Sequence, residues 1–148
     1  MTFSAEALYR SEHDEDPVVL ATDADVDALI DALLAEEWTH NLANIYIRQR
    51  PLNAAGVPDH ELCVGVDAER AVGGLRWYAG DEGSWYSLGA PSEFDEVIYY
   101  SMGSDTQFPA DSEISLDVVR RAVKEFLASG GRRPTCVPWQ PDPFAVGS

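Results

Sequence analysis

Two stretches of the chain repeat hydrophobic residues at helical spacing. The first follows Thr22, an expected N-cap with Asp25 three positions later in the manner of a capping box. The second follows Ser115, another N-cap type, and stops at Gly130. We expect helices over residues 22–37 and 115–130. The hydrophobic positions that define them are Val26, Leu29, Ile30, Leu33 and Leu34, then Leu116, Val119, Val123, Phe126 and Leu127.

Shorter hydrophobic runs, bounded by Gly, Pro and Asp, have the alternation or the β-branched and aromatic content of strands. They lie at residues 3–9, 18–21, 42–50, 61–67, 71–79, 84–88, 96–102 and 135–140. Gly73-Gly74 predicts a strand bulge, and residues 103–113 predict a polar loop. Together these features predict an α+β fold with a meandering, mostly antiparallel sheet of about six to eight strands. Two helices pack on one face, in a single domain over residues 1–140 with a flexible tail at 141–148.

Three pairs of adjacent aromatic residues lie in expected strands: Trp77-Tyr78, Trp85-Tyr86 and Tyr99-Tyr100. Successive strand residues point to opposite faces, so one member of each pair is expected to face the core and the other to face away. Outward aromatics on neighbouring strands are typical of a protein interface. In the alternative, both sheet faces are covered, one by helices and the other by the ends of the chain.

The balance of charged residues excludes some classes of binding partner. The 148 residues include 26 Asp and Glu but 10 Lys and Arg, for a net charge of −16. Residues 1–113 carry −18 and residues 114–148 carry +2. This excess of acid argues against sequence-independent binding of nucleic acid or of an anionic membrane, because phosphate affinity comes from basic side chains. No hydrophobic run approaches the roughly 20 residues that span a bilayer, and the first residues lack a signal peptide pattern. We expect a cytoplasmic protein.

Candidate catalytic chemistry is sparse. His13 and His40 are expected to be exposed, and His60-Glu61 lacks the second histidine of a zinc-protease motif, since position 64 is Val. Cys63 and Cys136 are expected to be small core residues. A Cys–His or carboxylate pair brought together by folding leaves a small hydrolase as an alternative function. We expect no metal and no cofactor.

Five segments, in this order and spacing, carry a family resemblance. They are Cys63 to Tyr78 (CVGVDAERAVGGLRWY), Gly83 to Ser87 (GSWYS), Val97 to Gly103 (VIYYSMG), Phe108 to Glu113 (FPADSE) and Phe126 to Gln140 (FLASGGRRPTCVPWQ). The chain from about Val18 to Gln140 resembles the immunity protein Imm1 family of actinobacterial polymorphic toxin systems. Two residues depart from the pattern: Trp77 is an extra residue before Tyr78, and Pro138 stands where a polar residue is expected.

The resemblance implies a non-enzymatic antitoxin whose partner is the C-terminal domain of a cognate toxin. In many Imm1 systems that domain is a zinc-dependent nucleic-acid cytidine deaminase, and a nuclease is the other toxin class considered. It implies no catalytic residues. Because a toxin acting on nucleic acid needs a basic surface, an acidic protein can cover that surface or the active site. The candidate contact residues are Glu12, Asp14, Glu15, Asp16, Asp81, Glu82, Trp85, Glu93, Asp95, Glu96, Asp105, Gln107 and Asp111.

Two further alternatives remain open at the level of sequence. An acidic nucleic-acid mimic that inhibits another enzyme would space its carboxylates like phosphates along one face. A ligand-binding barrel would enclose an apolar cavity. The oligomeric state has no signal in the sequence.

Overall fold

A computed structural model of the protein describes residues 3–36, 40–101 and 104–144. In chain order its elements are β1 (Ala5–Leu8), the 3-10 helix η1 (Ser11–Asp14), β2 (Val18–Leu20), α1 (Asp23–Ala35), β3 (Leu42–Ile47), β4 (His60–Asp67), β5 (Val72–Ala79), β6 (Gly83–Ser87), β7 (Val97–Ser101), β8 (Ser104–Phe108), β9 (Ile114–Ser115), α2 (Leu116–Ala128) and β10 (Trp139–Pro141). Neither helix is long and apolar enough to cross a bilayer, within the part of the chain described.

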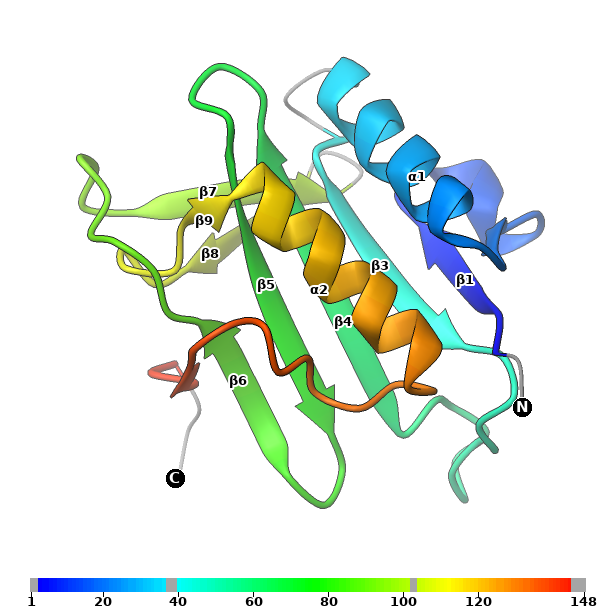
Figure 1. Cartoon of the computed structure of the whole chain (residues 1–148). Helices are drawn as coiled ribbons and strands as arrows, with labels where there is room; N and C mark the ends of the chain where they lie inside the picture. Colours follow the sequence, from blue (N-terminus) through cyan, green and yellow to red (C-terminus); the bar gives the residue numbers. More distant parts are fainter. Residues whose placement is uncertain (1–2, 37–39, 102–103, 145–148) are drawn as a thin grey trace.

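The main sheet is antiparallel and open, in the order β10-β6-β5-β4-β3-β1-β2, with the short β9 added to β5. Both helices lie on the same face of this sheet (Figure 1). The expected α+β fold, with two helices on one face of a mostly antiparallel sheet, is confirmed.

Side-chain caps begin both helices at the residues that the sequence indicates. The Thr22 hydroxyl accepts a hydrogen bond from the Asp25 backbone N–H, and the Asp25 carboxylate accepts one from the Thr22 N–H. The Ser115 hydroxyl caps α2 by accepting from Val118 N–H. Gly130 has a positive φ of 74° just after α2, where a residue with a Cβ would be strained.

The second face of the sheet is covered over one part by a separate hairpin of β7 and β8, which crosses behind the sheet in Figure 1. The hairpin buries Tyr99 and Phe108 against the sheet, and their rings meet edge to face at 4.9 Å. These rings lie over Gly65 and Gly74, which present no side chain to the hairpin. The alternative in which the ends of the chain cover this face holds only in part. The C-terminal segment contacts it at Tyr86, whose ring lies 5.9 Å from that of Phe144, and the hairpin from the middle of the chain covers the part around Gly65 and Gly74.

The observed strand pairings correct two expectations. Residues 104–108 form β8 rather than part of a polar loop, because they pair with β7 from Val97↔Phe108 to Ser101↔Ser104. The strand is polar because four of its five side chains are exposed or half-buried and only Phe108 is buried. Gly73-Gly74 is not a bulge, because β4 and β5 pair without interruption from His60↔Ala79 to Asp67↔Val72. Glycine is used here for close packing against neighbouring groups.

The element boundaries expected near the C-terminus also shift. The last strand begins at Trp139 rather than residue 135, and it lies at the sheet edge with Pro138 just before it. Pro141 still pairs with Trp85 in β6, and the Asp142 backbone N–H donates to Ser84 O at 3.1 Å. Contacts with the rest of the protein therefore continue to Phe144, four residues past the expected boundary at 140, where its ring lies 5.9 Å from that of Tyr86. Residues 145–148 lie outside the described part.

Candidate functional site

Two adjoining pockets lie where the β4–β5 turn, the end of α1 and the start of β7 come together. The inner pocket has a volume of about 230 Å³ and the outer one about 510 Å³, and they share Asn41, Asp67 and Ile98 as lining residues. We call the two together the acidic groove. Its lining contains five carboxylates and one arginine, namely Glu36, Asp67, Glu69, Glu96, Glu113 and Arg70.

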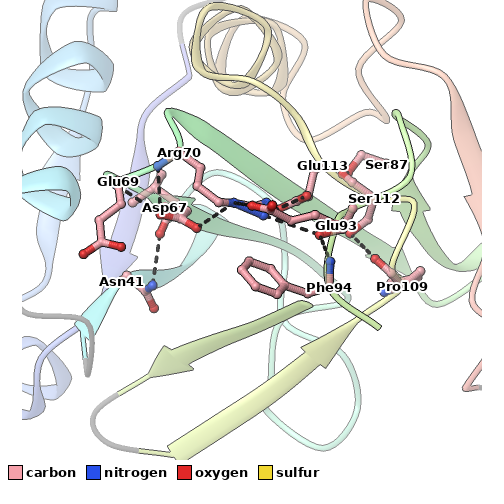
Figure 2. A network of polar contacts seen from close by, with 12 residues as sticks. Asn41, Asp67, Glu69, Arg70, Ser87, Glu93, Phe94, Pro109, Ser112 and Glu113 are labelled. Atoms are coloured by element: carbon pink, nitrogen blue, oxygen red, sulfur yellow. Dashed lines mark hydrogen bonds and ion pairs between the residues drawn. The ribbon is translucent and has the colours of Figure 1, made fainter. Parts of the chain in front are cut away.

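The β4–β5 turn holds Arg70 in place. The Asp67 carboxylate accepts hydrogen bonds from the backbone N–H groups of Glu69, at 3.1 Å, and Arg70, at 3.2 Å. This Asx turn ends at Ala71, which has a positive φ of 55°. The carboxylate thereby fixes the start of the arginine side chain that crosses the inner pocket (Figure 2).

The Arg70 guanidinium joins the turn to the loops before β7 and β9. It forms an ion pair and hydrogen bonds with the nearly buried Glu113 carboxylate. Its Nε lies 3.5 Å from Asp67 Oδ2 and 3.7 Å from Glu93 Oε1, and the group lies over the Phe94 ring at 4.9 Å (Figure 2). Arg70 is thus surrounded by carboxylates of its own chain, so the acidic groove keeps an excess of negative charge.

Asn41 fixes the opposite wall of the acidic groove. Its side-chain NH₂ donates to Val66 O in β4 at 3.0 Å, and its carbonyl oxygen accepts from Tyr100 N–H in β7 at 2.7 Å. One amide therefore ties the hairpin to the sheet. The apolar part of the lining includes Leu34, Phe94, Ile98 and Tyr100.

The structure divides the acidic candidates among separate regions. Glu93, Asp95 and Glu96 are exposed in the loop beside the acidic groove, where Glu96 lines the inner pocket. Asp81 and Glu82 are exposed at the β5–β6 turn, the opposite end of β5, roughly 25 Å away for a strand of this length. Sequence reasoning did not identify Glu36, Asp67, Glu69, Arg70 or Glu113, which come from different elements and converge only on folding.

The remaining candidates have mixed surroundings. The acids of η1 and its end are exposed, and neighbouring Arg10 connects this segment to the acidic groove through an ion pair with Glu36. On β8 and the following loop, Asp105 and Gln107 are exposed, whereas Asp111 accepts a hydrogen bond from Gln140 at 2.9 Å. The η1 group consists of Glu12, Asp14, Glu15 and Asp16.

Trp85 differs from the expected outward anchor. It is half-buried and packs against the main core, and its indole N–H donates to Glu82 O at 2.8 Å. The Arg133 guanidinium covers its ring at 4.5 Å. Tyr78 is the member of its pair that faces outward, with 37% of its surface exposed. The pair Tyr99-Tyr100 is not on a neighbouring strand of this sheet, because β7 belongs to the separate hairpin.

The uncovered part of the second sheet face carries Glu61 and Arg76, whose side chains are 3.5 Å apart. The Tyr46 hydroxyl donates to Glu61, and Cys63 Sγ lies 2.9 Å from the same carboxylate. Burial and the Glu61 charge raise the pKa of the Cys63 thiol. Cys63 is buried as expected, and its surroundings disfavour the thiolate that a nucleophilic cysteine needs. Cys136 is half-buried against the main core.

The histidines correct one expectation clearly. His13 is buried rather than exposed, because its Nδ1 accepts from the backbone N–H groups of Tyr9 and Arg10, each at 3.1 Å. His40 is half-buried. His60 is buried on the helix face of β4, opposite to Cys63, so these two do not form a pair. Within the described residues, no group of three or more His, Cys, Asp or Glu is placed to hold a metal ion.

His60 gives the fold a pH dependence. Its Nε2 accepts from the Ile47 backbone N–H at 2.8 Å, so Nδ1 carries the proton toward Asp59 Oδ1 at 2.9 Å. Burial lowers the pKa of His60 below the ordinary 6.5, against the opposing effect of Asp59. Below pH 6.5 the unfolded chain therefore binds a proton at His60 more readily than the folded chain does. The free energy of unfolding should fall as the pH drops below that value.

Urea denaturation at pH 7 and pH 5 checks this pH dependence. We expect His60→Gln to lose less stability over this interval than the unchanged protein, because glutamine does not titrate. Parallel losses in both proteins would show that carboxylates elsewhere cause the whole effect.

No curated protein matches the chain. The family model described as immunity protein Imm1 matches residues 14–141, which is most of the chain and includes every strand and helix from β2 to β10. The chain belongs to the immunity protein Imm1 family.

Proposed function

We propose that this immunity protein neutralises a toxin domain that acts on nucleic acid, in particular a cytidine deaminase. In this proposal the acidic groove and the exposed acids beside it bind the basic surface with which the toxin holds its substrate. The observation that carries the proposal is the acidic groove itself, whose lining holds five carboxylates and one arginine. Arg70 is already paired with Glu113, and Glu36 with Arg10, so negative charge remains in excess. Covering the substrate surface would inhibit the toxin without any catalytic step.

On the helix face of the molecule, basic side chains offset part of the negative charge. Arg120 and Lys124 on α2 pair with acids of α1 at 2.6–3.0 Å, so the acids on that face are locally neutralised. The net charge of −16 adds long-range attraction to a basic partner. Steering by the whole field and contact at the acidic groove would then act together.

The proposal is tested with the toxin domain encoded beside the gene. We expect the two proteins to co-purify, with an affinity that falls about tenfold or more when the salt concentration rises from 50 to 300 mM. Calorimetry measures the affinity, and deamination of a single-stranded DNA substrate measures inhibition. Absence of binding would contradict the immunity role. Binding that does not respond to salt would contradict its electrostatic basis, and a partner without deaminase activity would correct the toxin class.

A further inference from the structure

We propose that the inner pocket of the acidic groove receives a basic side chain, an arginine or a lysine, from the cognate toxin. This inference rests on the proposed function and adds the chemistry of one contact. The pocket places Asp67, Glu96 and Glu113 around a volume of about 230 Å³. At about 30 Å³ per water molecule, this volume suits one long side chain better than a folded segment.

The carboxylates of the inner pocket are unequally satisfied. Glu113 is 9% exposed and is held by Arg70, and Asp67 is held by the backbone of its turn and by the same arginine. Glu96 is exposed at the mouth of the pocket. An incoming cation therefore meets a carboxylate at the entrance and negative charge further in.

A second and independent feature is the Tyr99 hydroxyl. Tyr99 lines the inner pocket and is 2% exposed, and its hydroxyl has no hydrogen-bond partner. It is the one buried side-chain nitrogen or oxygen atom in that state among the residues the structure describes. A buried polar group without a partner reduces stability. A donor supplied by a partner protein would remove this cost.

The state of the hydroxyl fits a cationic donor. Burial raises the pKa of Tyr99, with the Asp67 charge adding to the effect, so the phenol stays neutral and its oxygen can accept an N–H. The hydroxyl packs close to Gly74, where an added Cβ would come within 3.3 Å of the oxygen. An arginine or lysine carries several N–H donors and can bond to the phenol and a carboxylate together.

The walls of the acidic groove fit the aliphatic part of such a side chain. Phe94 is 54% exposed beside the inner pocket, and Ile98 forms part of both pockets. Lysine and arginine cover apolar surface with their methylene groups while the charged end reaches polar partners. Carboxylates, a neutral hydroxyl and apolar walls thus favour the same ligand class.

The first test compares Tyr99→Phe with Tyr78→Phe in binding the toxin domain. Tyr99→Phe removes an oxygen that has no partner within the protein, so the folded state loses no hydrogen bond. We expect it to weaken toxin binding about tenfold while thermal stability is retained or increased. Tyr78 lies on the uncovered part of the second face, away from the acidic groove, and its variant should bind like the unchanged protein.

The second test needs no toxin. With tyrosine rings labelled with ¹³C, titration of Nα-acetyl-argininamide and Nα-acetyl-lysinamide should shift the Tyr99 signals in a saturable way, and Nα-acetyl-citrullinamide, whose side chain is neutral, should not. Equal shifts for Nα-acetyl-citrullinamide would overturn the inference, as would unchanged toxin affinity of Tyr99→Phe when the unchanged protein binds. If the unchanged protein fails to bind the toxin, the proposed function fails, and the small-molecule titration still decides whether the pocket accepts a cation.

Discussion

Gly65→Ala is expected to lower the free energy of unfolding by about 3 kcal/mol, at the upper end of the cost of overpacking. The new Cβ would lie 2.5 Å from Cδ2 and 2.6 Å from Cδ1 of Tyr99, well inside contact distance. Gly65 does not have a positive φ, so the backbone itself accepts alanine and the whole effect comes from packing.

Tyr99 cannot easily move away from the added methyl group. Its ring meets Phe108 edge to face at 4.9 Å, and its far end lies beside Gly74. The added atom must therefore lift the β7–β8 hairpin or shift β4. Either movement also disturbs the acidic groove, because β7 supplies one of its walls.

Gly80→Ala is the matched control. Its Cβ would have Asp59 O as its nearest neighbour, at the ordinary distance of 3.8 Å, so the change in stability should stay within about 0.5 kcal/mol. Urea denaturation followed by tryptophan fluorescence measures both variants. In addition, Gly65→Ala should cost little in a Tyr99→Ala background, because the clashing ring is gone. Similar small effects for Gly65→Ala and Gly80→Ala would show that the hairpin does not pack on Gly65 as described.

The sequence predicts the helices well because their signals are local. Thr22 and Asp25 cap α1 through bonds within four residues, and Gly130 stops α2 through its own backbone preference. The hairpin is different. β8 is mostly polar because one side of it faces solvent, and its identity depends on pairing with β7. The matched five-residue runs on either side of Met102-Gly103 were the available signal for a hairpin.

The residues of the acidic groove could likewise be predicted only where they lie close together in the sequence. Glu93, Asp95 and Glu96 could be chosen from the sequence because they lie together in one loop. The other carboxylates reach the acidic groove from α1, the β4–β5 turn and the segment before β9. With 26 acids in the chain, composition could not distinguish them. Likewise, glycine is needed at Gly65 and Gly74 because Tyr99 and Phe108 pack on them from another part of the chain, which the sequence does not show.

Charge reversal beside the acidic groove should produce the largest change in toxin binding. We expect Asp95→Lys/Glu96→Lys to weaken the affinity about a hundredfold, since like charges placed opposite each other in an interface cost several kcal/mol. Both residues are exposed, so the fold should remain intact. Calorimetry near physiological salt measures the affinity, and growth of cells that express the toxin measures protection.

Asp81→Lys/Glu82→Lys separates local contact from overall charge. Both double variants change the net charge from −16 to −12, so each loses the same share of long-range attraction. The second pair is also exposed but lies at the opposite end of β5, and we expect its affinity to change by about threefold or less, the effect of steering alone. Equal losses would mean that only net charge matters. A larger loss at the β5–β6 turn would move the toxin contact away from the acidic groove, because the two ends of one strand of this length cannot both lie under a single small contact.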